Sequence, residues 1–501
     1  MMDDKARFTR LPAQPRALGY YIAGRWHGQE GRECLARVAP GYGVEVSRVT
    51  LCTAGDVNRA VEAARSVFGA GHWSRATGAE RAGVLLRAAN GIRSRLEELA
   101  YWETLETGKP ISQSRAEIGG AAGHYEYCAG LAQTLHGQSF NTYGDDLFGL
   151  VIREPVGVVG LINPWNFPFI VLAERLPYIL ASGNSLVVKP SEMTSTTTLK
   201  MADILAEAGL PEGVYNVVTG LGPVVGQALA EHRDIDVISF TGSTRTGEAV
   251  LKASATNFKK ASLELGGKNP QIVFADADLE DAADGVAFGM CFNAGQCCVS
   301  GSRLIVEAAA QEEFTALLAG KLARIRVGDC LDPTSQMGAI VSAGHCAKIE
   351  GYVALGAQEG GEVVVGGRRV DVTEGGLFYA PTLLAKVRND MRVAREEIFG
   401  PVLSIIPFRD ADEAVALAND SPYGLAASVW SKNIDKALGT IRRVNGGRTW
   451  INTTIAGGPG QPLGGYRQSG IGREAGLAGV EEYTEVKSVH VALGKRRPWI
   501  S

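Results

Sequence analysis

The 501-residue sequence has little net charge, few cysteines and no apolar segment at its start. A net charge of −4 gives no electrostatic basis for binding nucleic acid or an anionic membrane surface. The eight cysteines are scattered, which argues against the disulfide framework of a secreted protein. The first residues, MMDDKARFTR, lack the apolar core of a signal peptide. We therefore expect a cytoplasmic protein with no nucleic-acid or membrane partner.

Metal-site spacing and an uninterrupted membrane-length segment are lacking as well. There is no CxxC motif, and none of the seven histidines lies near the Cys297–Cys298 pair in the sequence, so we expect no metal. The uncharged stretch 156–173 is long enough to cross a bilayer, but two prolines and two asparagines interrupt it. We interpret this stretch as a buried strand, a loop and the start of a helix.

Strand-like apolar runs alternate with helical patterns along much of the chain. Helices are expected at 56–68 and from a capping box at Thr77–Glu80 to about Thr107. The following apolar runs are 157–162, 185–190, 214–218 and 236–240, with helical patterns at 193–208, 223–231 and 245–256. A second series has strands at 271–274 and 303–307 around a helix at 278–294. This alternation predicts two α/β units with parallel sheets, the first doubly wound and of nucleotide-binding type.

The segment FTGSTRTG, 240–247, follows an expected strand and leads into an expected helix. Its glycines are not spaced as in GxGxxG, so alone it fits an ordinary strand–turn–helix junction as well as a phosphate site. In VVKPSE, 187–192, Lys189 can donate to ribose or phosphate oxygens and Glu192 can accept from ribose hydroxyls. A carboxylate there repels a 2′-phosphate and favours NAD over NADP, although the two residues could also form a surface ion pair.

The stretch FNAGQCCVSG, 292–301, contains the adjacent cysteines Cys297 and Cys298. A cysteine can be a nucleophile, but it is more often a small buried apolar residue, and a disulfide between neighbours is strained. Nothing in the sequence nominates the histidine that a cysteine hydrolase would need. Glu264 in LELGGK and Asn166 in NPWNFP add a carboxylate base and an amide donor. Nucleophile, base and oxyanion donor together indicate acyl-type chemistry.

These segments together resemble the NAD(P)-dependent aldehyde dehydrogenase superfamily. The resemblance runs from about residue 20 to 490 and includes PWNFP, KPSE, FTGS, LELGGK, GQCC, EEIFGP and GGYRQSGIGRE in that order. The 34-residue separation of Glu264 and Cys298 also matches the family pattern. Motif order and spacing agree over nearly the whole chain, which makes the resemblance specific.

The resemblance implies a role for each of these positions. Cys298 would be the nucleophile, Glu264 the general base, and Asn166 the oxyanion donor together with the Cys298 N–H. The positions that match the cofactor site are Trp165, Lys189, Glu192, Gly222, Gly242, Ser243, Glu397 and Phe399. The positions that match the substrate tunnel are Phe167, Val171, Glu174, Cys297, Val299, Gly457 and Leu463.

The reaction implied is oxidation of an aldehyde to its acid with NAD, NADP being less favoured. It proceeds through a thiohemiacetal and a thioester on Cys298, and the thioester is hydrolysed by water that Glu264 activates. A CoA-acylating semialdehyde dehydrogenase is the alternative, but Glu264 argues for water as the acceptor. Glu174 stands where many members carry an aromatic residue, so it could attract a cationic aldehyde. It could equally pair with a nearby arginine or point away from the tunnel.

The resemblance also implies three parts and a homo-oligomer. Residues 1–131 and 153–262 would form the cofactor-binding domain, and residues 263–470 the catalytic domain. Residues 132–152 and 471–501 would form a small β oligomerisation arm. The alternating segment 483–493 predicts an exposed edge strand that can pair with a strand of another subunit. We therefore expect a homodimer or a homotetramer.

Overall fold

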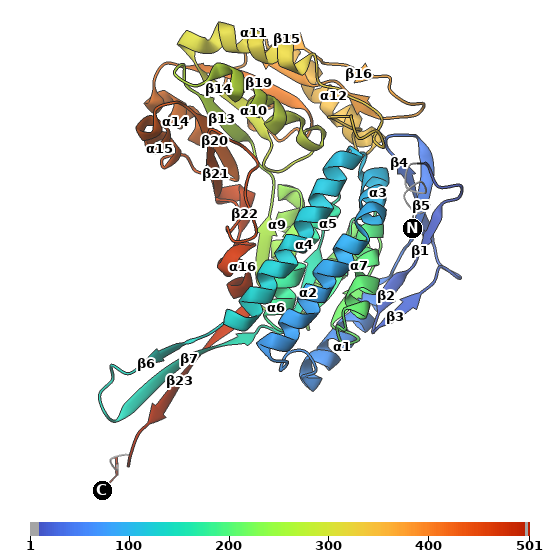
Figure 1. The fold of residues 1–501 in the computed structure, drawn as a ribbon, viewed down its shortest axis with the longest axis vertical. Coiled ribbons are helices and arrows are strands. Elements are labelled where there is room, and N and C mark those ends of the chain that lie inside the picture. Colours follow the sequence, from blue (N-terminus) through green and yellow to red (C-terminus); the bar gives the residue numbers. More distant parts are fainter. Residues whose placement is uncertain (1–9, 496–498, 501) are drawn as a thin grey trace.

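The computed structural model describes residues 10–495 and 499–500, and it is an α/β structure with two large sheets and a projecting β arm. In Figure 1 the second sheet, with its helices, lies above the first, and the arm extends from the opposite end. Both large sheets are mainly parallel and carry helices on both faces, as the alternating sequence predicts.

The first sheet has eight strands among the described residues, in the order β22-β12-β11-β8-β9-β10-β2-β3. Their bounds are β2 (Tyr20–Ile22), β3 (Arg25–His27), β8 (Val158–Ile162), β9 (Ser185–Lys189), β10 (Tyr215–Val217), β11 (Val237–Thr241), β12 (Lys260–Glu264) and β22 (Gly470–Ile471). Strands β8 to β12 run parallel, and β22, β2 and β3 are added antiparallel at the two ends. The chain order reverses between β8 and β11, which is the switch point at which doubly wound sheets bind ligands.

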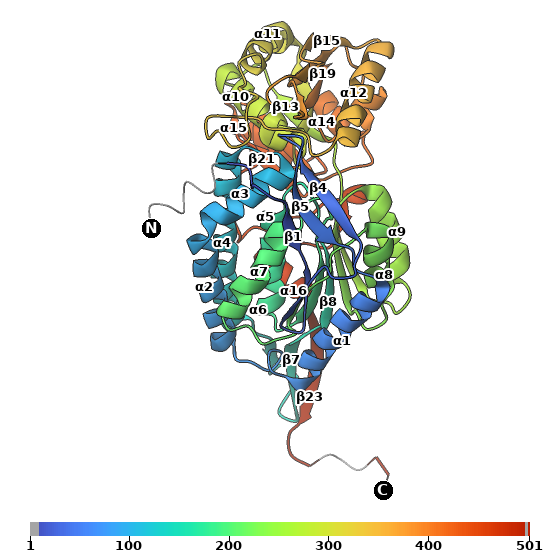
Figure 2. The same ribbon diagram turned by 90° about the vertical axis from the view of Figure 1, so that its right-hand side faces the viewer.

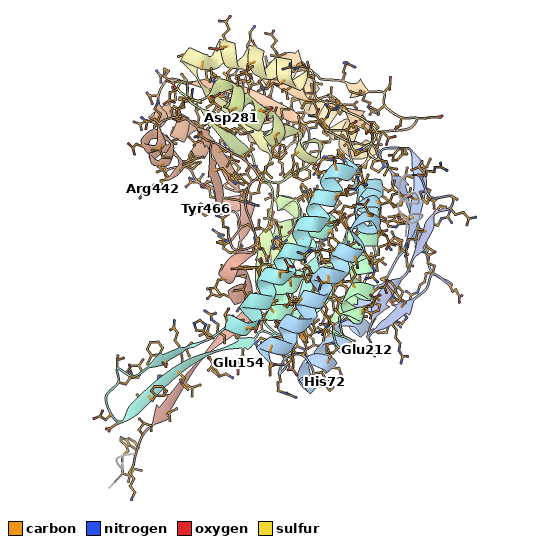
Figure 3. All side chains as sticks on the ribbon, viewed as in Figure 1. His72, Glu154, Glu212, Asp281, Arg442 and Tyr466 are labelled. Atoms are coloured by element: carbon orange, nitrogen blue, oxygen red, sulfur yellow. The ribbon has the colours of Figure 1, made fainter. Side chains whose placement is uncertain are left out.

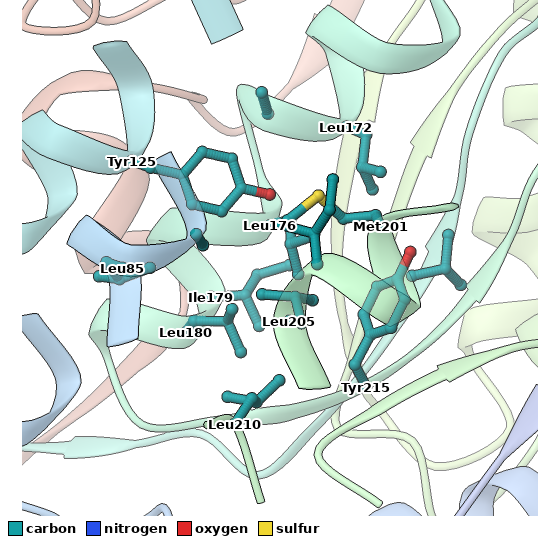
Figure 4. Close-up of a cluster of buried hydrophobic side chains, with 14 of the residues drawn as sticks. Leu85, Tyr125, Leu172, Leu176, Ile179, Leu180, Met201, Leu205, Leu210 and Tyr215 are labelled. Atoms are coloured by element: carbon teal, nitrogen blue, oxygen red, sulfur yellow. The ribbon is translucent and has the colours of Figure 1, made fainter. Parts of the chain in front are cut away.

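Side chains of the central strands alternate between two cores. On β9, Leu186 and Val188 enter one core and Val187 the other. The first core lies against α2 (Gly78–Ser94), α4 (Ile111–Thr134), α5 (Pro168–Ala173), α6 (Leu176–Ala181) and α7 (Thr196–Glu207). Figure 4 shows part of it, with Leu85, Tyr125 and Leu205 converging from three different helices. The second core lies against α1 (Ala54–Ala70), α8 (Gln227–Glu231) and α9 (Thr244–Ser254).

The second sheet has seven strands in the described part of the chain, in the order β15-β18-β19-β14-β13-β20-β21. Their bounds are β13 (Asn269–Val273), β14 (Gly301–Glu307), β15 (Glu362–Val365), β18 (Thr382–Ala385), β19 (Val402–Phe408), β20 (Ala426–Trp430) and β21 (Arg448–Ile451). One face packs on α10 (Leu279–Cys291), α11 (Gln311–Leu322), α12 (Ala343–Gln358) and α13 (Arg392–Arg395). The other face packs on α14 (Ala411–Asn419) and α15 (Ile434–Ile441).

The arm is a three-stranded sheet of β6 (Gln138–Phe140), β7 (Leu147–Pro155) and β23 (Thr484–Ala492), in the order β23-β7-β6. Both ribbon views show it projecting from the body, and Glu154 marks its base in Figure 3. The expected edge strand thus pairs with β7 of its own chain along its whole length. Its other edge has no strand beside it in the described residues.

Shorter elements complete the described chain. A three-stranded sheet contains β1 (Arg16–Leu18), β4 (Cys34–Ala39) and β5 (Val44–Thr50), and a two-stranded one contains β16 (Arg369–Val370) and β17 (Phe378–Tyr379). The helix α16 (Gly476–Glu482) leads into the arm. Over the described residues, none of the helices has the length and apolar character needed to cross a membrane. The stretch 156–173 forms β8, a loop and α5, as predicted.

Three expected helices differ from the structure. The helix expected from Thr77 to Thr107 has the predicted capping box but breaks at Arg95, whose ψ of 17° separates α2 from α3 (Leu96–Thr107). The helix expected at 223–231 begins with a π-turn, η2 (Gly222–Gly226). The helix expected at 278–294 ends at Cys291, and a tight turn, η3 (Phe292–Gly295), follows it. Tertiary contacts at these ends override the local helical preference.

Candidate active site

The residues expected at the site follow the carboxyl ends of parallel strands in the first sheet. Asn166 lies in the loop after β8, Lys189 ends β9, Gly242 follows β11, and Glu264 ends β12. Because these strands run parallel, their carboxyl ends meet at one edge of the sheet. That edge is where a doubly wound sheet forms its ligand crevice.

Lys189 and Glu192 form an ion pair beside this crevice. The Lys189 Nζ lies 3.4 Å from a Glu192 carboxylate oxygen and donates to the Pro190 carbonyl at 2.8 Å. Burial lowers the pKa of Lys189, and Glu192 opposes that shift. Gly222 opens η2, and a Cβ added to Gly226 at its end would lie 3.6 Å from the Lys189 Cδ. The crevice therefore has a cation and a carboxylate beside a segment of small residues.

The start of α9 presents polar groups, one of which has no partner in the described chain. Ser243 caps the helix by accepting from the Thr246 N–H at 3.3 Å. The Thr241 hydroxyl is buried without a hydrogen bond in the described residues, and the Thr244 hydroxyl lies beside Tyr423. A helix N-terminus with an unpaired buried hydroxyl fits a phosphate-bearing cofactor.

Glu397 and Phe399 lie beside the chain that connects the two sheets. A Glu397 oxygen accepts from the Gly267 N–H at 3.1 Å, and burial raises the pKa of Glu397. Phe399 has φ of +61°, and its ring meets Trp165 edge-on at 5.4 Å between ring centroids. The His345 Nε2 lies 2.6 Å from the Phe399 carbonyl, which holds this strained backbone in place. Trp165, Glu397 and Phe399 are thus brought together.

The chain turns sharply between the end of α10 and Cys298. Asn293 and Ala294, with φ of +51° and +53°, and then Gly295, with φ of +68°, turn the chain left-handedly. The Asn269 side chain donates to the carbonyls of Cys298 at 2.7 Å and Ser300 at 2.8 Å. This turn and the Asn269 amide fix the backbone of Cys298 at the cavity.

Asn166 packs against the same turn. Its Nδ2 donates to the Gln296 carbonyl at 3.1 Å, and the Asn293 side chain donates to the Asn166 carbonyl at 2.9 Å. The Gln296 side chain in turn accepts from the Val341 N–H at 2.9 Å. The amide of Asn166 therefore lies beside the chain two residues before Cys298, within a network that joins both sheets.

The titrating groups of this site have strongly shifted pKa values. A hydrogen bond with Cys297 and burial raise the pKa of Cys298, and the Glu174 carboxylate adds to the rise. Burial raises the pKa of Glu264 well above its usual value, partly offset by Arg175, and one Glu264 oxygen has no partner in the described chain. A buried carboxyl and a thiol with shifted pKa values in one cavity are typical of a catalytic site.

A cavity of about 890 Å³ contains both groups and all seven positions expected in the substrate tunnel. Phe167 stacks on Phe292, with 5.7 Å between ring centroids. Glu174 has no ion pair within 4.0 Å in the described residues, so the arginine pairing considered from the sequence is not present. Asn166 does not line this cavity but lies behind it.

The sequence analysis missed several residues of this site. Glu117, His124 and Arg448 also line the cavity, although they come from α4 and from β21. Lys268 is buried between the sheets with no partner for its Nζ in the described chain, and burial lowers its pKa to about 7. No short motif marks the three cavity residues, whereas Lys268 is part of the quoted LELGGK segment.

Comparisons with known proteins agree with this geometry. Residues 26–489 match the model of the aldehyde dehydrogenase family. Betaine aldehyde dehydrogenase of Bacillus subtilis is 43% identical over 94% of this chain and 96% of its own. The crystal structure of an NAD-dependent aldehyde dehydrogenase from Sinorhizobium meliloti has a TM-score of 0.96 and 49% identity, covering 99% of this chain and 98% of that one. Indole-3-acetaldehyde dehydrogenase of P. syringae, solved with NAD+, has a TM-score of 0.94 and 41% identity over 98% and 99% of the two chains. The chain belongs to the aldehyde dehydrogenase family.

Proposed function

We propose that this enzyme oxidises a cationic aldehyde to its carboxylic acid with NAD, through a thioester on Cys298. The observation that carries the proposal is one cavity that contains the Cys298 thiol, the buried Glu264 carboxyl and the unpaired Glu174 carboxylate. The crystal structures of relatives that contain NAD+ support the choice of cofactor.

Cys298 reacts as the thiolate and forms a bond to the aldehyde carbon, while the carbonyl electrons move to oxygen. The Asn166 amide and the Cys298 N–H stabilise that oxyanion. Lys189, Glu192, Ser243 and Glu397 would hold NAD, which would accept the hydride that the thiohemiacetal loses when it becomes the thioester. Glu264 then takes a proton from water, the resulting hydroxide attacks the thioester, and the acid leaves as the thiolate is regenerated.

Glu264 favours water over CoA as the acceptor of the acyl group. It lines the same cavity as Cys298, and a carboxyl with a raised pKa is suited to exchange protons with water near neutral pH. Glu192 favours NAD, because a carboxylate beside the adenosine ribose would repel the 2′-phosphate of NADP. These two preferences go beyond the family assignment, because the family includes enzymes that use water or CoA as the acceptor and NAD or NADP as the cofactor.

A cation is the complementary charge for the cavity wall. Glu174 has no ion pair in the described chain, whereas the neighbouring Glu117 is neutralised by Lys109 at 2.5 Å. Phe288 and Phe292 also line the cavity and add aromatic rings, which attract cations when water is excluded, whereas the Phe167 ring already faces the Lys109 ammonium at 4.3 Å. The betaine aldehyde dehydrogenase relatives fit this choice, whereas the indole-3-acetaldehyde relative shows that family membership does not determine the substrate.

The first test compares two six-carbon aldehydes, hexanal and 6-(trimethylammonio)hexanal, by NADH absorbance at 340 nm. Glu174→Gln is expected to raise KM for the cationic aldehyde about 10-fold, the value of one partly desolvated charge contact, and to leave hexanal within about 2-fold. Both are measured at a pH where the rate has reached its plateau, since Glu174 also raises the pKa of Cys298.

Two controls separate the parts of this proposal. Cys298→Ala should abolish NADH formation with either aldehyde, and activity in that variant would exclude the nucleophile. Asp284→Asn removes another carboxylate from the cavity rim, one that lies 3.8 Å from Lys321, and should leave both KM values unchanged. Equal effects of Glu174→Gln on the two aldehydes would exclude the cation site.

We also propose the three-part division given above and assembly of two or four chains through the arm. What supports the assembly is the unpaired outer edge of β23 and its exposed side chains in the described structure. A strand edge of this kind is a template for another sheet.

A further inference from the structure

Arg448 is a second charged group that faces the substrate cavity without a carboxylate partner. It begins β21, lines the cavity, and has no carboxylate within 4.0 Å in the described residues. Its guanidinium lies 5.4 Å from the Trp450 ring centroid, and its Nη2 makes a long contact of 3.4 Å to the Ala456 carbonyl. The Trp450 indole donates to the same carbonyl at 2.6 Å. The Arg448 guanidinium is therefore held in place before a ligand binds, and most of its N–H donors remain free.

Gly457 is the reason that this guanidinium can reach the cavity. A Cβ added at Gly457 would lie 2.6 Å from the Arg448 Nη2. Any larger side chain there would displace the guanidinium from the wall. The position of the Arg448 guanidinium therefore depends on the absence of a side chain at residue 457.

Glu174 and Arg448 both line the cavity. After the contact with Cys297 and burial, Glu174 also raises the pKa of Cys298. Both residues act on His124: burial lowers the pKa of His124, Glu174 raises it and Arg448 lowers it further. Gly457 lies beside the Arg448 guanidinium. The cavity wall therefore carries both a carboxylate and a guanidinium.

Two other charged groups of the cavity have partners of their own. Glu117 is paired with Lys109, and Gln113 donates to its other oxygen at 2.7 Å. The Arg326 Nε donates to the Thr334 carbonyl at 2.9 Å. Glu174 and Arg448 form no ion pair with each other in the described chain. The two charges therefore do not neutralise each other, and each can meet an opposite charge of a ligand.

We propose that Arg448 is a specificity-determining residue that binds a carboxylate, and that the substrate is a zwitterionic aldehyde with an ammonium and a carboxylate remote from the aldehyde carbon. The ammonium contacts Glu174, and the carboxylate contacts Arg448, whose planar donors match a carboxylate in two parallel hydrogen bonds. This inference rests on the proposed function for its cationic half, while its carboxylate half depends on Arg448 alone.

The test uses the NAD-loaded enzyme and four aldehydes built on a six-carbon chain, which carry no charge, a cation, a carboxylate or both charges. They are hexanal, 6-(trimethylammonio)hexanal, 6-oxohexanoate and 2-(trimethylammonio)-6-oxohexanoate, in which the quaternary nitrogen prevents cyclisation. The zwitterion should have the highest kcat/KM. Arg448→Gln should lower kcat/KM about 10- to 100-fold for the two carboxylates, as expected for a lost charge-assisted contact. Hexanal and the cation should stay within about 2-fold, which also shows that the variant is folded.

Two further variants test the donor geometry of Arg448 and the effect of removing the same charge elsewhere. Arg448→Lys keeps the charge but not the planar pair of donors, so its loss should be smaller than that of Arg448→Gln. Arg442→Gln removes the same charge from an exposed residue that follows α15 and is not among those lining the cavity, labelled in Figure 3, and should change nothing.

Each outcome bears on one half of the inference. A uniform effect of Arg448→Gln on all four aldehydes, or a cation preferred to the zwitterion, would overturn the role of Arg448. A selective loss for both carboxylates together with no selective effect of Glu174→Gln would overturn the proposed cation site and the zwitterion, while keeping a carboxylate site at Arg448.

Discussion

At the scale of the residue, the catalytic candidates were visible in the sequence because each stands in a short motif. Cys298 follows a glycine, Glu264 stands at the end of a strand, and Asn166 lies between two prolines. Each of these is a local signal. Arg448 was not visible, because its proximity to the cavity depends on the missing side chain of Gly457 and on the Trp450 ring. Such contacts are made by tertiary packing, and no local pattern reports them.

Asn166 allows a test of oxyanion stabilisation with only a small change to the turn around it. In Asn166→Ala the backbone carbonyl still accepts from Asn293, and the Gln296 carbonyl loses the Asn166 amide but keeps that of Asn293, so the variant should fold with a loss of about 1 kcal/mol. Loss of one oxyanion donor costs about 3 kcal/mol, so we expect kcat to fall roughly a hundredfold. A fall of less than about fivefold in kcat would remove Asn166 from this role.

At the scale of the element, the alternation of strands and helices predicted both sheets, but not how the helices end. The strands at 185–190 and 236–240 were correct to within two residues, because buried parallel strands are continuous apolar runs. The end of α10 was wrong, because Asn293 and Ala294 adopt a left-handed conformation that alanine does not favour. The strain lies at the turn that presents Cys298, where function and propensity conflict.

Gly295 tests how much this turn depends on close backbone contact. A Cβ at Gly295 would lie 2.3 Å from the carbonyl atoms of Gly400, and φ of +68° disfavours any other residue. Gly295→Ala should therefore push apart the nucleophile turn and the segment that carries Phe399. We expect a loss of more than about 2 kcal/mol in the free energy of unfolding, together with a large loss of kcat.

A matched glycine provides the control for that variant. Gly320 lies on the exposed side of α11, where an added Cβ would meet nothing within 4 Å. Gly320→Ala should raise the free energy of unfolding by about 0.5–1 kcal/mol and leave kcat unchanged. Urea unfolding of both variants measures the difference. If Gly295→Ala behaved like Gly320→Ala, the close approach would have no role in holding the turn.

At the scale of the whole molecule, the arm is the feature that the isolated chain does not explain. Figure 1 shows it projecting from the body beyond its base, where Arg153 of β7 pairs with Glu481 of α16, and eight of the nine residues of β23 are at least partly exposed. The alternation predicted the strand but not its partner, whereas the family resemblance already grouped residues 132–152 and 471–501 in one arm, in which β23 pairs with β7. A small sheet with so little buried surface gains stability by pairing with another copy.

The exposed valines of β23 make that assembly testable. Val486 and Val491 are 56% and 39% exposed in the single chain, although both are apolar. If the arm joins the subunits, aspartates at both positions place buried charges in the interface and should dissociate it. Light scattering should then give a mass near the 53.0 kDa of one chain instead of twice or four times that mass. Val363→Asp, on the edge strand β15 at the other end of the molecule, changes an equally exposed valine of 38% and should leave the mass unchanged. An unchanged mass in the double arm variant would instead mean that the arm does not hold the subunits together, and that the free edge of β23 is protected by its charges alone.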